Sequence, residues 1–299
     1  NLWIAQLIES LRAKFPDLII HQPSFRFIPT YDIDEAYSYR HKQLWRIAGG
    51  FMRSAMRGEW SMMREMINVV WGKPKDPYDA FEWMDGLNRR YDLRPIYFFL
   101  IASKTARYDK NILSSKKAMQ KLVAEHSSRY ETGIHPSWRS GDDPAELKLE
   151  ILRLDHIEGK QIHYSRQHYI RFSLPETFRQ LIDLDIESDF SMGYGSINGF
   201  RASVASPFYW YDLEKEEQTK LMIYPFCFMD ANSFYKQNLS PQEALEELKH
   251  FYHVVRSVNG TLITIWHNNF LGTAKKFKGW REMYEEFVRM VWERQMSNQ

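Results

Sequence analysis

The chain has 299 residues, which is enough to bury a sizeable core and allows either one large α/β domain or two smaller ones. Lys and Arg number 40 against 38 Asp and Glu, a net charge of +2 with no long basic or acidic run, so neither nucleic acid nor an anionic membrane is indicated as a partner. A single cysteine, Cys227, excludes an internal disulfide framework and makes a thiolate metal cluster implausible.

No apolar run is long enough to span a bilayer, and the first residues do not look like a secretion signal, so we expect a cytoplasmic protein whose N-terminus could be incomplete. The aromatic content of 15% is high. Core filling explains most of these rings, and the alternative is an aromatic-lined cleft of the kind that stacks on sugar rings.

In chain order, residues 2–15 have apolar residues at helical spacing and end before Pro16. We expect residues 1–24 to form an N-terminal helix and its lead-in, and residues 25–299 to form the main domain. Residues 27–36 then read as an apolar strand that runs into a turn carrying two acids.

Side chains in an extended strand repeat every second residue, so Asp32 and Asp34 are expected to point to the same side. Two neighbouring carboxylates repel each other, and one must be neutralised by a metal, a proton or a cation. The alternative is an acidic strand end that only caps the next helix.

Helices and strands alternate through the rest of the chain. A long helical segment over residues 37–70 could roof a cleft. Helices are expected over residues 78–90, 115–128, 144–157, 174–184, from 240 and over 279–296; strands are expected at 94–101, 131–135, 161–169, 186–190 and 260–267, with 199–207 and 220–228 as possible paired strands. This alternation without a linker predicts one α/β barrel of parallel strands, with its site at their C-terminal ends.

Acids and imidazoles follow several of these strands. The residues at the strand ends are Asp32, Asp34, His135, Arg166, His168 and His267. A single histidine is more often a hydrogen-bonded structural residue, but three histidines and two aspartates at the strand ends of one barrel indicate a functional site.

The order of these residues resembles that of the polysaccharide deacetylases, the NodB-like proteins of carbohydrate esterase family 4, and in particular an uncharacterised bacterial branch. The motifs that carry the resemblance are Asp-Ile-Asp at 32–34, Gly-Ile-His-Pro-Ser at 133–137, Ser-Arg-Gln-His-Tyr at 165–169, Met-Gly-Tyr at 192–194 with Gly-Phe-Arg-Ala at 199–202, and Ile-Trp-His-Asn at 265–268. They are specific as a set and weak one by one.

The resemblance implies a distorted (β/α)7-type barrel and a divalent metal, usually zinc, that supports hydrolysis of an N-acetyl or O-acetyl group on a sugar. By position, Asp32 corresponds to the catalytic base and His267 to the acid that protonates the leaving amine. Arg166 corresponds to the arginine that orients the base, although Arg171 aligns nearly as well.

The metal ligands implied by the resemblance are Asp34 and His135. The family has a second histidine four residues after the first, and here that position is Arg139, which cannot ligate a metal because its guanidinium stays protonated. Either another residue completes the set or the site holds no catalytic metal. His168 is the expected substitute, since it ends the neighbouring strand on the same face as Arg166.

Further residues are candidates for substrate binding: Trp138, Asp189, Tyr194 and Arg201, the last of which could instead pair with Asp189. Three hypotheses remain open: a metal-dependent sugar deacetylase, a non-catalytic carbohydrate-binding or scaffolding protein on the same barrel, and a barrel hydrolase acting on another substrate such as a cyclic amide. The expected partner is a carbohydrate, and the sequence does not define the oligomeric state.

Overall fold

The computed structural model describes residues 1–72 and 74–297. Its strands are β1 (Arg26–Ile33), β2 (Ile96–Phe99), β3 (Glu131–Ile134), β4 (Tyr164–Ser165), β5 (Ser188–Asp189), β6 (Phe208–Asp212), β7 (Glu217–Ile223), β8 (Phe228–Met229) and β9 (Thr261–His267). Its α-helices are α1 (Leu2–Lys14), α2 (Leu44–Met56), α3 (Trp60–Val70), α4 (Phe81–Arg90), α5 (Lys117–Ser127), α6 (Pro144–Glu158), α7 (Glu176–Asp183), α8 (Pro241–Ser257) and α9 (Trp280–Met296).

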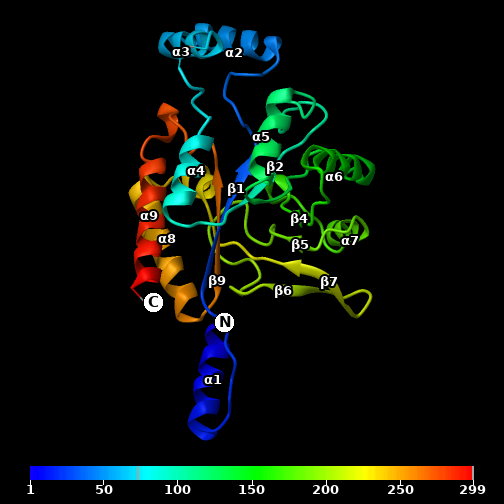
Figure 1. Ribbon diagram of the computed structural model, residues 1–299, viewed down its shortest axis with the longest axis vertical. Coiled ribbons are helices and arrows are strands. Elements are labelled where there is room, and N and C mark those ends of the chain that lie inside the picture. The colour runs from blue at the N-terminus through cyan, green and yellow to red at the C-terminus, as the bar shows by residue number, and fades with distance from the viewer. Residues whose placement is uncertain (73, 298–299) are drawn as a thin grey trace.

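In the described ranges the nine strands form one curled sheet, in the order β6-β7-β5-β4-β3-β2-β1-β9-β8. Neighbouring strands are parallel except β6 and β7, which form an antiparallel pair. Helices flank the sheet on its outer side, with α8 and α9 beyond β9 and α5, α6 and α7 beyond the strands on the opposite side (Figure 1). The α/β fold of the distorted (β/α)7-type barrel is therefore confirmed.

Alternation along the strands divides the core into two layers. On β2, Tyr97 and Phe99 belong to the large cluster that includes the flanking helices, whereas Phe98 belongs to a smaller cluster inside the curl of the sheet. The same parity places Ile263 and Ile265 of β9 inside. Burial of each such side chain contributes about 2 kcal/mol, so the register is strongly fixed.

Three expected elements differ from the structure. The strand expected over residues 161–169 is reduced to β4, and His168–Ile170 is a 3₁₀ helix instead. Residues 199–207 form turns and no strand, because Gly199 and Ser203 take positive φ angles that an extended strand does not allow. The antiparallel hairpin lies later, at β6 and β7. The helix expected over 78–90 begins at Phe81, since residues 76–80 form turns in which Asp79 N–H donates to the Asp76 carbonyl.

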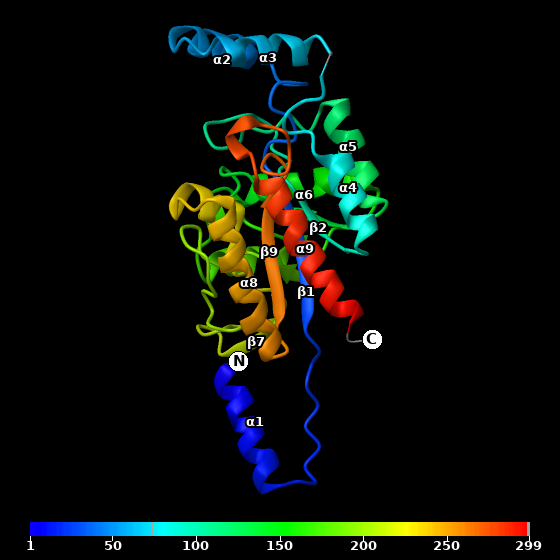
Figure 2. The same ribbon diagram turned by 90° about the vertical axis from the view of Figure 1, so that its left-hand side faces the viewer.

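Two segments stand away from the barrel. Helix α1, none of whose residues is buried, projects from the end at which β1 begins, and the α2–α3 hairpin lies across the opposite end (Figures 1 and 2). The hairpin's base is held by the buried Asp76, whose carboxylate accepts the backbone N–H groups of Ser38, Tyr39 and Arg40. None of the described helices is both long enough and apolar enough to cross a membrane.

Candidate functional site

Strand β1 delivers both acids of the Asp-x-Asp pair to the inside of the barrel. Asp32 lies beside His267 in the β1–β9 register, and the side chain of Asp34, just past the strand, points the same way. His135 Nε2 lies 3.9 Å from Asp32 Oδ2 and 3.0 Å from Asp34 Oδ1. The two carboxylates therefore face one imidazole, as the two-residue repeat of a strand predicts.

Three imidazoles converge on the Asp34 carboxylate. His135 follows β3, His168 follows β4, and His267 ends β9. Nε2 of His168 lies 3.4 Å and Nε2 of His267 lies 3.5 Å from Asp34 Oδ2. Because β3, β4, β1 and β9 all run in the same direction, residues at their C-terminal ends meet at one rim.

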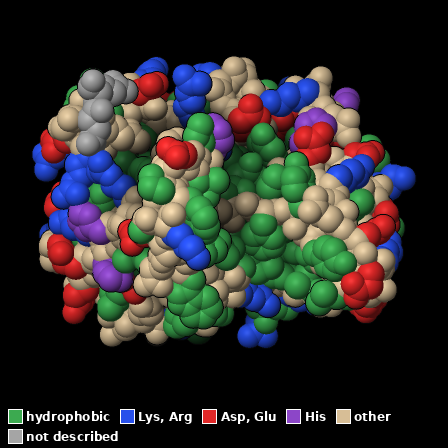
Figure 3. All heavy atoms as spheres, turned by 90° about the horizontal axis from the view of Figure 1, so that it is seen from below, with side chains coloured by type: hydrophobic (Ala, Val, Ile, Leu, Met, Phe, Trp, Pro, Cys, Tyr) green, Lys and Arg blue, Asp and Glu red, His purple; other side chains and the backbone are tan. Residues whose placement is uncertain are grey.

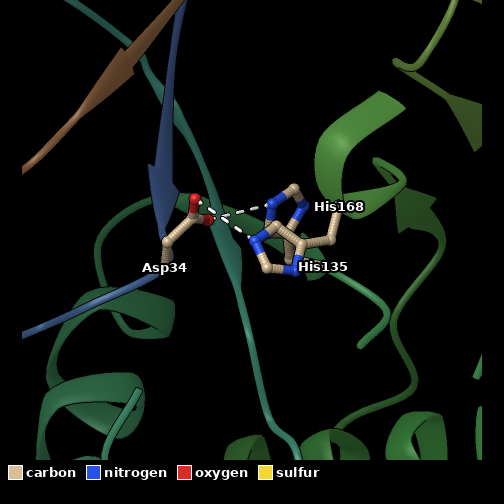
Figure 4. A group of neighbouring side chains, drawn as sticks. All are labelled: Asp34, His135 and His168. Atoms are coloured by element: carbon tan, nitrogen blue, oxygen red, sulfur yellow. Dashed lines mark ion pairs between the residues drawn. The ribbon is translucent and has the colours of Figure 1, made fainter. Parts of the chain in front are cut away.

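Three of these residues form a compact set of possible metal ligands. One donor atom each from Asp34, His135 and His168 lies within 4.8 Å of the others, and among the described residues His267 is not part of that group (Figure 4). Both histidines of the group are buried, while 27% of the Asp34 side chain is exposed. The opening toward solvent therefore lies on the side of Asp34.

An oxygen atom lies near the other ring nitrogen of each imidazole, and for His135 and His267 the contact is a hydrogen bond. His135 Nδ1 lies 2.6 Å from the Arg166 carbonyl, His168 Nδ1 lies 3.3 Å from Asp109 Oδ1, and His267 Nδ1 lies 2.6 Å from Asp230 Oδ1. A carbonyl oxygen only accepts, so Nδ1 of His135 carries a proton and Nε2 is left free in the neutral ring.

Asp109 and Asp230 are residues that sequence reasoning missed. Asp230 follows the two-residue strand β8, and a hint was available, since it ends the apolar run Phe226–Met229. Asp109 lies in an irregular loop before α5, where no periodicity marks it. Both are buried, and both reach the rim only through tertiary packing.

The charges of this cluster reinforce one another. Burial opposes ionisation of Asp34, but the neighbouring His168 and His267 outweigh it and hold the pKa of that carboxyl well below its usual range. Burial likewise opposes protonation of His267, yet the charges of Asp230 and Asp34 raise its pKa to about 10. Without another cation present, His267 is thus an imidazolium at neutral pH.

A buried arginine holds Asp32 in place. Arg166 Nη1 lies 2.9 Å from Asp32 Oδ1 and also donates to the Thr30 hydroxyl, while its Nε donates to the Phe190 carbonyl. The guanidinium lies 4.5 Å from the centre of the Phe98 ring inside the sheet. This arrangement leaves Oδ2 of Asp32 facing the site.

Arg139 and Arg171, which lie at or near the family's motif positions, point away from Asp32. Arg139 is exposed, and its Nη2 lies 3.6 Å from Asp143. Arg171 donates to the Trp138 carbonyl and pairs with Asp142, so it does not contact Asp32. Among the aligned arginines, Arg166 is therefore the one that touches the acid.

An aromatic cluster borders the histidines. The rings of Tyr108 and Trp138 stack with centroids 4.1 Å apart, and the Tyr169 ring, 5.6 Å from Trp138, lies 4.4 Å from the His168 ring. Tyr169 is half exposed. Tyr194 is also exposed, and the neighbouring Gly195 lies against the backbone of Tyr169.

Asp189, an expected substrate residue, is placed differently, and it does not pair with Arg201. Asp189 is fully buried, and its carboxylate accepts hydrogen bonds from Ser165 and Ser191, so it braces the strand ends and has no surface facing the cleft. Burial raises the pKa of Asp189 to about 6. Arg201 is exposed and stacks on the Phe172 ring at 4.6 Å, and no ion pair in the described part of the chain joins it to Asp189.

The three clustered residues suit a divalent metal. One carboxylate and two imidazoles are donors that zinc and similar ions accept. The buried Asp34 Oδ1 has no hydrogen-bond partner in the described protein, and it lies 3.0 Å from His135 Nε2, which carries a lone pair when the proton of the ring is on Nδ1. Two lone pairs at this separation repel unless a cation or a proton lies between them.

Neither a family model nor a curated protein matches this sequence. A solved structure from Mycobacterium smegmatis, assigned as a polysaccharide deacetylase, matches with a TM-score of 0.56 and 13% identity over 92% of this chain and 86% of that one. A protein from Parabacteroides distasonis, assigned as a glycoside hydrolase/deacetylase, matches with a TM-score of 0.56 and 12% identity over 91% and 68%. Puue allantoinase matches with a TM-score of 0.54 and 12% identity over 89% and 83%. The chain has the fold of the polysaccharide deacetylases.

Proposed function

We propose that this protein is a metal-dependent hydrolase that removes an acetyl group from a sugar of a polysaccharide or glycoconjugate. The observation that carries the proposal is the convergence of Asp34, His135 and His168 within 4.8 Å, with Asp32 and His267 beside them. In this proposal the three residues hold the metal, zinc being the expected ion, and His168 takes the place of the family's missing histidine at Arg139.

A divalent ion held by Asp34, His135 and His168 would supply a Lewis acid that polarises the acetyl carbonyl and makes an attacking water more acidic. Asp32 is placed to accept a proton from that water at Oδ2, while Arg166 fixes its other oxygen. Because Arg166 is buried and lies between Asp32 and the Phe98 ring, the acid has little freedom to turn away.

His267 supplies the proton to the leaving group. Its Nδ1 is hydrogen-bonded to Asp230, and its Nε2 points toward the Asp34 carboxylate at the open side of the site. The charge of Asp230 raises the pKa of His267, which favours the protonated ring that a departing amine requires. The base and the acid come from the neighbouring strands β1 and β9.

The acetylated sugar is proposed to lie against the aromatic cluster of Tyr108, Trp138 and Tyr169. Flat rings next to polar groups are the usual partners of the apolar faces of sugars. Tyr194 and Arg201 are exposed, and we expect them to contact neighbouring sugar units.

Metal content and turnover test the proposal together. Purified wild-type protein, loaded with zinc, cobalt or nickel, should release acetate from N-acetylated oligosaccharides. Asp32→Asn should lose at least about a hundredfold in turnover with metal still bound, and Asp34→Ala should lose both. Because the Asp32→Asn substitution leaves buried Arg166 without its counter-charge, the variant should also lose about 3 kcal/mol of stability, so assays belong well below its melting temperature.

Full turnover by Asp32→Asn would refute the role of Asp32. The non-catalytic alternative predicts that the protein binds glycans but has neither bound metal nor turnover. The exposed Arg139, at the position where the family has a metal-binding histidine, is the observation that favours this alternative. The likeness to an allantoinase supports including a cyclic amide in the substrate panel.

A further inference from the structure

The α2–α3 hairpin exposes an unusual amount of apolar surface. Its exposed large hydrophobic residues are Leu44, Trp45, Met52, Met56, Trp60, Met62, Ile67, Val70 and Trp71. Met56 and Trp71 each expose nearly four-fifths of their surface. Monomeric soluble proteins rarely leave so many large apolar side chains together in water, and such patches mark interaction surfaces.

The exposed apolar residues follow helical spacing. Helix α2 packs on α3 through the side that carries Gly50 and the buried Ser54, and a Cβ added at Gly50 would lie 3.3 Å from the Met66 side chain. At about 100° per residue, Trp45, Met52 and Met56 fall roughly 150° from that side, on the free face of the helix. A helix covered by water on its free face normally carries polar residues there.

Basic residues border this apolar face. Arg53 and Arg57 of α2 and its following turn are exposed, and so is Arg64 of α3. The hairpin's two acids are partly buried and turned to internal partners, Glu59 to the Ser54 hydroxyl and Glu65 to the Tyr39 hydroxyl. The outer surface of the hairpin is therefore apolar and cationic, although the whole chain has a net charge of only +2.

We propose that the α2–α3 hairpin docks this protein on an anionic lipid surface, with the two helices lying in the plane of the membrane. Tryptophan and methionine beside arginine on exposed helix faces are typical of interfacial helices, which bury their apolar face and pair their cations with anionic headgroups. A second copy of the chain is disfavoured as the occupant, because it would bring the same arginines against Arg53, Arg57 and Arg64.

The position of the hairpin relates the proposed membrane contact to the candidate site. It lies across the end of the barrel at which β1 and β9 finish, the same end that carries the histidine cluster (Figures 1 and 2). Docking would therefore turn the catalytic rim toward the membrane surface. The docking proposal itself does not depend on the proposed deacetylation.

Vesicle sedimentation tests the proposal with the full-length protein. We expect binding to phosphatidylcholine vesicles that contain about one-quarter phosphatidylglycerol, and at least about tenfold weaker binding to phosphatidylcholine alone or in high salt. The double variants Trp45→Ser/Met56→Ser and Arg53→Glu/Arg57→Glu should each weaken binding by about tenfold or more. Leu213→Ser/Lys215→Glu, on the exposed turn between β6 and β7, is the matched control and should bind like wild type.

A second apolar surface must be distinguished from the hairpin. Helix α1 exposes Leu2, Trp3, Ile4 and Leu7 at the opposite end, where apolar side chains gather around a hollow (Figure 3). Because α1 lies at the opposite end from the hairpin, the variant Trp3→Ser should leave vesicle binding unchanged. Loss of binding in Trp3→Ser with retention in both hairpin variants would overturn the proposal, as would no binding to anionic vesicles.

Oligomeric state provides an independent check. Light scattering should give the mass of a monomer for wild type and for Trp45→Ser/Met56→Ser across a wide concentration range. A wild-type dimer that this variant converts to a monomer would show that a second copy covers the hairpin, and the membrane proposal would fail. A thermal melt confirms that each variant is folded before it is scored.

Discussion

At the scale of single residues, the site depends on how each imidazole is turned. His135, His168 and His267 each direct Nε2 toward Asp34 and place Nδ1 against an oxygen acceptor, although the three acceptors come from unrelated parts of the chain. A ligand imidazole held through its second nitrogen keeps its tautomer and orientation. His135 and His267 make hydrogen bonds through Nδ1, whereas Nδ1 of His168 lies 3.3 Å from the Asp109 carboxylate without hydrogen-bond geometry.

We expect Asp109 to position His168 for metal binding without touching the ion. Asp109→Ala should weaken zinc affinity about tenfold to a hundredfold, because His168 loses the carboxylate that lies 3.3 Å from its Nδ1. Titration calorimetry of the metal-free protein measures this directly. Asp142→Ala, which removes an exposed partner of Arg171, is the control and should bind zinc normally. Equal affinities in the two variants would contradict the role of Asp109.

Strand parity explains which site residues could be predicted from sequence. Asp32 and Asp34 two residues apart, and His267 at the end of a buried strand, have positions that the two-residue repeat determines. Asp109 and Asp230 lack such a pattern, since one lies in a loop and the other follows a two-residue strand. The burial of Asp189 could not be predicted from the sequence either, because Ser165 and Ser191 come together around its carboxylate only in the folded sheet.

At the scale of elements, α6 supports the loop that carries His135. Glu150 of this helix is fully buried and its Oε2 accepts the backbone N–H of Ser137 at 2.9 Å. Burial raises the pKa of Glu150 to about 7, and the hydrogen bonds from Ser137 only partly offset this. The folded protein therefore holds a proton on Glu150 more tightly than the unfolded chain does.

The difference between the pKa of Glu150 in the folded and unfolded states predicts how stability changes with pH. Between about pH 4.5 and about pH 7 the folded state binds more protons at Glu150 than the unfolded state, so its contribution to stability falls as the pH rises. Glu150→Gln cannot ionise, so its free energy of unfolding does not contain this pH-dependent decrease. The unfolding free energy of the variant minus that of wild type should therefore rise by about 3 kcal/mol between pH 4.5 and pH 8. Urea unfolding at several pH values measures it. The exposed Glu125→Gln should show no such trend, and a flat difference for Glu150→Gln would contradict this account.

The long elements were the predictable ones. Helix α8 begins at Pro241, and Ser240 before it forms a capping box. Strand β9 is a nearly continuous apolar run, so the bounds of both elements follow from local sequence. The hairpin of β6 and β7 was expected too early, because the apolar residues of 199–207 pack in turns rather than in a strand. The two-residue strands β4 and β5 are stabilised by pairing with neighbouring strands of the sheet. Two residues are too few to show a strand pattern, so their bounds could not be predicted from the sequence.

At the scale of the whole molecule, the barrel and the α2–α3 hairpin are largely separate. The hairpin leaves and rejoins the barrel next to Asp76, and Arg46 makes its contact with the loop before α5 by donating to the Ala106 and Lys110 carbonyls. Replacing residues 44–71 by a short Gly-Ser linker should leave a cooperative melt within about 5 °C of wild type. Calorimetry measures it, and a broad, non-cooperative melt would show that the hairpin belongs to the core.

The central claim is that Asp34, His135 and His168 bind one divalent metal at the rim of the barrel. Diffraction from crystals of the zinc-loaded protein, recorded on both sides of the zinc absorption edge, tests it most directly. We predict one strong anomalous peak about 2 Å from a donor atom of each of the three residues. No peak there, or a zinc ion bound elsewhere with these side chains unliganded, would contradict the account.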